Sequence, residues 1–81
     1  SIQMMSSTDL TKIQSFLNSL INSNENKYYE DDFYIVALNT TIGIDYFLLY
    51  KNFENKEKAI VYCNKYIDKL KKCLIVNVQN F

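Results

Sequence analysis

Hydrophobic residues recur along this chain with two different periods. Between Leu10 and Ile21 the apolar side chains recur every three or four residues, which is the period of an amphipathic helix. A second stripe with the same spacing runs from Ala59 to Leu70, and Asn55 stands where it can cap that helix. The pattern therefore predicts two helices.

Four other segments have the alternation or the composition of strands. They are residues 1–7, 33–39, 44–50 and 73–78. Gly43 lies between the two middle segments, where a hairpin loop favours a positive φ. The predicted order is β-α-β-β-α-β, an α+β fold. It gives a four-stranded antiparallel sheet with two helices on one face, the RNA-recognition or ferredoxin-like topology.

Composition narrows the classes of function. The 81 residues suffice for one domain, and 48 % of them are hydrophobic, including 7 Tyr and 5 Phe. Nine lysines balance nine acidic residues, and the chain has no Arg and no His. Without His there is no imidazole base or His-containing zinc site, and neutral charge without Arg argues against nucleic-acid binding. We therefore expect a binding module that is not an enzyme and has no metal or cofactor.

The chain also bears on membranes and on cysteine pairing. No apolar stretch approaches the roughly 18 residues that span a bilayer, and no signal peptide opens the sequence. We expect residues 1–81 to be one domain excised from a longer exported or membrane-anchored protein. Cys63 and Cys73 are ten residues apart, and a helix running almost to Cys73 would separate their sulfurs by about 15 Å. The sequence thus favours two small apolar residues in or near the core over a disulfide, which an oxidising compartment would permit.

Side-chain alternation assigns the two faces of the expected sheet. Residues that should point to the helices are Ile2, Met4, Tyr46, Leu48 and Tyr50. The opposite face, called the open face below, would carry Gln3, Met5, Asp45, Phe47 and Leu49 and, if Ile75 points inward, Leu74, Val76 and Val78. A solvated face normally carries polar residues, so a face this apolar is expected to meet a ligand.

The order of four short segments resembles that of a known family. Ile2-Gln3, followed by Met4, Met5 and two serines, is similar to its first strand and helix entry. Residues 45–53 (DYFLLYKNF) resemble its third strand and the loop after it, and residues 55–59 (NKEKA) resemble the start of its second helix. Residues 72–76 (KCLIV) stand in place of a lysine-proline-tryptophan segment. Over nearly its whole length the chain resembles a SPOR (sporulation-related repeat) domain, a small bacterial peptidoglycan-binding module.

The resemblance implies a ligand and a location. SPOR domains bind glycan strands stripped of stem peptides on the open sheet face, and such glycan accumulates at division septa, outside the cytoplasm. By position, Gln3 and Ser6 match the family's polar glycan-contacting pair. Asp45 and Leu74 stand where many members have Trp, Val76 where Arg is common, and Lys51 where Gly is usual.

Two interpretations of the open face stay open. One is a periplasmic glycan-binding domain that places its parent protein at the septum, with no membrane contact of its own. The other is a protein-interaction or self-association module that buries the apolar face against a partner chain. Structural roles compete at single positions, because Ser6 and Asp9 have capping-box spacing and a loop could cover Phe47 and Leu49.

Overall fold

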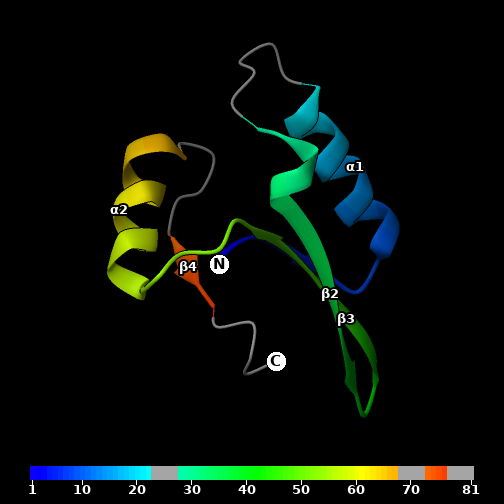
Figure 1. Cartoon of the computed structure of the whole chain (residues 1–81). Helices are drawn as coiled ribbons and strands as arrows, with labels where there is room; N and C mark the ends of the chain where they lie inside the picture. The colour runs from blue at the N-terminus through cyan, green and yellow to red at the C-terminus, as the bar shows by residue number, and fades with distance from the viewer. Residues whose placement is uncertain (23–27, 68–72, 77–81) are drawn as a thin grey trace.

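The computed structural model describes residues 1–22, 28–67 and 73–76, and its elements follow the predicted order (Figure 1). They are β1 (Ile2–Ser7), α1 (Leu10–Ile21), the 3-10 turn η1 (Glu30–Asp32), β2 (Phe33–Thr40), β3 (Gly43–Tyr50), α2 (Lys56–Tyr66) and β4 (Leu74–Ile75). All strand pairs are antiparallel, and the strands are ordered β2-β3-β1-β4 across one sheet. The predicted α+β fold is confirmed.

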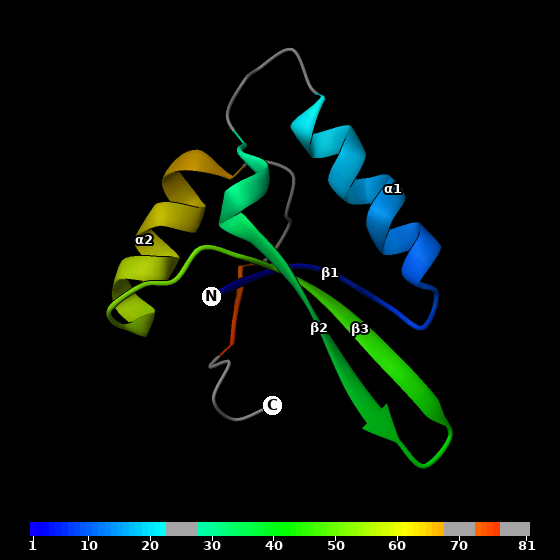
Figure 2. The same cartoon turned by 45° about the vertical axis from the view of Figure 1, so that its right-hand side comes forward.

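Both helices pack on the same face of the sheet. Ile13 and Leu20 of α1 and Ala59 of α2 belong to one buried cluster. The strands contribute Ile2, Met4, Leu48 and Tyr50 to it. The β2–β3 hairpin extends beyond both helices (Figure 2), so its far end leaves Ile42 96 % exposed. The core is therefore concentrated where the central strands β1 and β3 meet the two helices.

Side chains at the helix starts explain where α1 and α2 begin. Asn55 caps α2 as predicted, because its Oδ1 accepts from Lys58 N at 2.9 Å. Asp9 caps α1 by accepting from Thr11 N at 2.9 Å, and Ser7 Oγ accepts from Asp9 N. A cap at Ser6 is wrong, since Ser6 still belongs to β1. No helix in the described part of the chain is long and apolar enough to cross a membrane.

The two cysteines form a disulfide, so the prediction of free thiols is wrong. Their sulfurs are bonded and their Cα atoms lie 6.1 Å apart. The prediction assumed a helix running almost to Cys73, but α2 ends at Tyr66 and Ile67 has an extended backbone. Because the helical rise does not continue to Cys73, the two residues can meet. The bond ties the buried face of α2 to the chain that enters β4.

Candidate binding face and adjoining cleft

A β-bulge in β1 changes which side chains reach the open face. Gln3 pairs with Leu49, but Met5 pairs with Leu48 instead of Phe47, so the register shifts by one residue. Met5 therefore packs half-buried against the helix-side core. The prediction that Met5 lies on the open face is wrong, because strict alternation does not hold across a bulge.

The same shift brings Ser6 to the open face. Ser6 lies opposite Phe47, which in turn lies opposite Val36 of β2. Residues directly opposite in antiparallel strands share a face, so these three form one row across the sheet. Ser6 is exposed and Phe47 is half-buried.

A second row crosses all four strands beside the first. Gln3 lies between Leu49 of β3 and Leu74 of β4, and Leu49 lies opposite Tyr34 of β2. Gln3 and Tyr34 are half-buried, and Leu74 is 45 % exposed. Leu49 is fully buried, so it offers no accessible surface to a ligand.

The remaining candidates lie at the two ends of the open face. Asp45 is half-buried opposite Leu38, toward the hairpin turn. Val76 is half-buried at the other end, where its N–H donates to Ser1 O at 3.0 Å and its carbonyl accepts from Ser1 N at 3.1 Å. Ile75 packs against the core, as the assignment of Leu74 and Val76 to the open face requires. Val78, the third residue of that prediction, lies outside the described residues. The structure thus groups Gln3, Ser6, Phe47 and Leu74, flanked by Asp45 and Val76.

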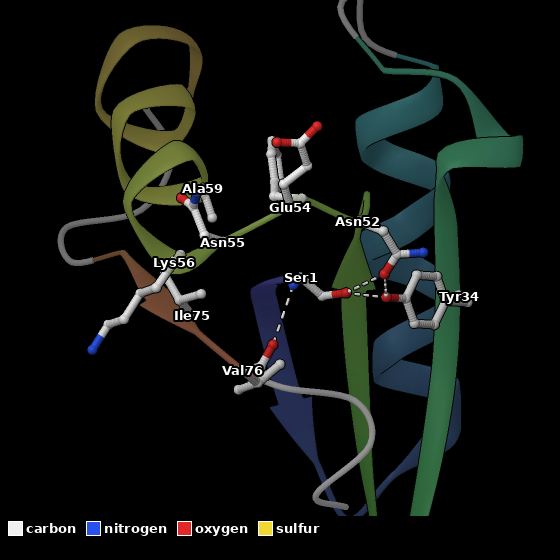
Figure 3. A pocket seen from close by; sticks show the side chains of 10 residues that line it. Ser1, Tyr34, Asn52, Glu54, Asn55, Lys56, Ala59, Ile75 and Val76 are labelled. Carbon is white, nitrogen blue, oxygen red and sulfur yellow. Dashed lines mark hydrogen bonds between the residues drawn. The ribbon is translucent and has the colours of Figure 1, made fainter.

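A cleft of about 830 Å³ opens at the end of the sheet where β3 leads into α2 (Figure 3). The residues lining it are Ser1, Tyr34, Asn52, Phe53, Glu54, Asn55, Lys56, Ala59, Ile75 and Val76. Ala59 is buried, Ile75 and Val76 are half-buried, and residues 54–56 are exposed at the rim. The cleft therefore has apolar surface at its base and polar side chains around its opening.

Hydrogen bonds hold one wall of this cleft. Asn52 Oδ1 accepts from Tyr34 Oη at 2.7 Å and from Ser1 Oγ at 3.0 Å, and the two hydroxyls also contact each other. Figure 3 shows these three side chains converging from the residue before β1, from β2 and from the loop after β3. The network holds Tyr34, which belongs to the Gln3 row, at the wall of the cleft.

The charged side chains at the rim of the cleft differ in whether they form ion pairs. Glu54 Oε2 lies 2.5 Å from Lys58 Nζ, one turn further along α2. Lys51, on the loop side, pairs with Asp32 at 3.6 Å. Lys56 forms no ion pair with any residue that the structure describes, and its side chain extends outward from the rim (Figure 3). A positive charge is therefore available beside the cleft.

Tyr34 and Asn52 were not recognised from the sequence. Pairing the two hairpin strands across Gly43 places Tyr34 opposite Leu49, so the hairpin itself contained a signal for Tyr34. Asn52 follows the strand, where no periodicity applies. Among the described residues, no group of three or more His, Cys, Asp or Glu is arranged to hold a metal ion.

Comparisons with known proteins identify no relative of this chain. No protein-family model matches it. Neither a curated protein nor a solved structure matches it. Its function is therefore inferred from the residues and the geometry of the open face and the cleft.

Proposed function

We propose that this domain binds peptidoglycan glycan strands that lack stem peptides, without catalysing a reaction, and so targets its parent protein to the division septum. One observation carries the proposal. The bulge in β1 puts Gln3 and Ser6 on the same face of the sheet, although strict alternation would separate them. These two residues match the glycan-contacting pair of SPOR domains. An amide and a hydroxyl each donate and accept hydrogen bonds, as sugar hydroxyls and acetamido groups require.

The backbone at Lys51 supports the resemblance to SPOR domains. Lys51 has φ 54°, in the left-handed region that side chains with a Cβ seldom adopt. The family usually has Gly at this position. A loop of the same shape therefore accounts for glycine in the family, and here Lys51 is held in it by a backbone hydrogen bond to Asp32 O at 2.9 Å.

Phe47 gives the face an aromatic surface beside the polar pair. Phe47 lies opposite Ser6, in the row next to the one that contains Gln3. A sugar has an apolar face formed by its C–H groups and a polar edge formed by its hydroxyls. Gln3 and Ser6 are suited to the polar edge, and the half-buried Phe47 lies beside them.

The disulfide supports a location outside the cytoplasm. Disulfides persist in oxidising compartments such as the bacterial periplasm and are rare in the cytosol. The Cys63–Cys73 bond joins α2 to the chain before β4, so it belongs to the framework of the fold. A periplasmic or other extracytoplasmic domain is in the compartment where peptidoglycan lies.

Self-association through the open face has less support than the sequence indicated. The apolar residues expected at that interface are Met5, Phe47, Leu49 and Leu74. Met5 packs half-buried against the helix-side core and Leu49 is fully buried. Phe47 is half-buried, and Leu74 is 45 % exposed. This smaller surface favours a ligand recognised through polar groups over a second copy of the chain.

Retention on peptidoglycan sacculi tests the proposal. We expect retention of the folded domain to increase when an amidase has stripped the stem peptides. Gln3→Ala should lower retention, whereas Gln14→Ala, which removes an exposed amide from α1, should leave it unchanged. A folded wild-type domain that is not retained would contradict glycan binding. A dimer that dissociates on Phe47→Asp would then identify self-association instead.

A further inference from the structure

We infer that the cleft between the sheet end and α2 is a second subsite, which takes an acidic N-acetylated sugar and holds its carboxylate at Lys56. The inference rests on the proposed function, because a glycan on the open face is what would enter the cleft. It extends that function by adding the positive charge of Lys56 to the binding site, because Gln3 and Ser6 are both neutral.

The open face and the cleft form one continuous surface. Ser1 directly precedes β1 and exchanges backbone hydrogen bonds with Val76, so it continues the strand; two residues from Gln3, it shares the same face and lies about 7 Å away. Tyr34 belongs to both places, since it ends the row that contains Gln3 and also lines the cleft. A glycan lying over Gln3 and continuing toward the end of the sheet therefore reaches the cleft within about one sugar ring.

The shape of the cleft suits a sugar with an acetamido group. Apolar side chains of Ala59, Ile75 and Val76 line its base and can pack against ring C–H groups or an acetyl methyl. The hydrogen-bonded wall of Tyr34 and Asn52 is already ordered before a ligand arrives. Ordering these side chains on binding then costs little conformational entropy.

The positive charge of Lys56 at the rim of the cleft is complementary to the free carboxylate of a glycan strand without stem peptides. Hydrolysis of the amide that attaches a stem peptide leaves a free carboxylate on the sugar, whereas an intact strand has a neutral amide at that place. Lys56 forms no ion pair with a described residue, whereas Glu54 pairs with Lys58. The positive end of the α2 dipole lies at the same rim, since Lys56 is the first residue of α2. The cleft thus favours the anionic, peptide-free sugar.

Two soluble glycans test this assignment. One is a stripped glycan with free carboxylates, and the other is the same glycan with its carboxylates converted to methylamides. The wild-type domain should bind the acidic form more tightly. Lys56→Gln should weaken binding of the acidic form by about 2- to 5-fold and leave binding of the amidated form unchanged. Lys12→Gln, at an exposed lysine of α1, is the matched control and should change neither.

Tyr34→Phe provides a second variant within the cleft wall. Loss of its hydroxyl removes one of the two hydrogen bonds that Asn52 Oδ1 accepts and should weaken binding of both glycans, while Tyr29→Phe, at a 68 % exposed tyrosine, should not. Equal binding of the two glycans by the wild type, with no effect of Lys56→Gln, would overturn the cleft assignment and leave glycan binding on the open face intact. Failure of the wild type to bind either glycan would instead refute the proposed function.

Discussion

Ser6 lies opposite Phe47 in the β1–β3 ladder, whereas Gln3, three residues earlier, lies opposite Leu49. Without the bulge, Ser6 would lie opposite Tyr46 and point toward the helices. The extra residue in β1 thus has two effects that cannot be separated. It gives Ser6 to the open face, and it gives Met5 to the core.

Substitution of Met5 tests this register. Because Met5 packs half-buried against the core, Met5→Ala should lower the free energy of unfolding by about 1–2 kcal/mol, less than a fully buried methionine would cost. Ser6→Ala should change it by less than about 0.5 kcal/mol, because Ser6 is exposed and does not cap α1. Urea unfolding measures both. Equal effects of the two substitutions would contradict the bulge.

Reduction of the disulfide should destabilise the domain. The bond closes a loop of ten residues, and the chain-entropy model gives such a loop about 2–3 kcal/mol. Urea unfolding with and without dithiothreitol should therefore show a lower midpoint under reducing conditions. The double variant Cys63→Ala and Cys73→Ala should show no response to the reductant. If wild type and double variant respond alike, the reductant does not act through this bond.

Local patterns predicted most of the fold because the forces behind them are local. The apolar period of Leu10 to Ile21 gave the bounds of α1 correctly, since one face of that helix has to be buried. Gly43 located the hairpin, where its φ of 150° is open to glycine. Asn55 predicted the start of α2 because its capping hydrogen bond, from Lys58 N, is also a local interaction within one turn.

Features that depend on contacts between residues far apart in the chain could not be predicted from the sequence. At the bulge both Met4 and Met5 pack on the helix-side core, and no alternation rule signals this arrangement. The disulfide depends on where α2 ends, which the apolar stripe placed too late. Asn52 has its role only because Tyr34 and Ser1 converge on it from two strands. Each of these became visible only in the assembled sheet.

Tyr50 makes the stability of the domain sensitive to alkaline pH. Its side chain is 1 % exposed, and burial raises the pKa of its hydroxyl above the usual value, with a further increase from the Tyr62 hydroxyl 3.5 Å away. A raised pKa in the folded state means that the folded protein keeps a proton that the unfolded chain loses. The stabilisation is therefore complete below about pH 10, the ordinary pKa of tyrosine, and decreases as the pH rises above it.

Tyr50→Phe should remove this part of the pH dependence. We expect the free energy of unfolding of the wild type to fall more steeply between pH 9 and 11 than that of the variant, by at most about 1.4 kcal/mol per pH unit for one proton. Tyr29→Phe is the matched control, because Tyr29 is 68 % exposed, and it should keep the wild-type slope. The comparison uses slopes, so a change in stability at pH 7 caused by the lost Tyr62 contact does not affect it. Parallel slopes for wild type and Tyr50→Phe would show that Tyr50 ionises as readily in the folded domain as in the unfolded chain.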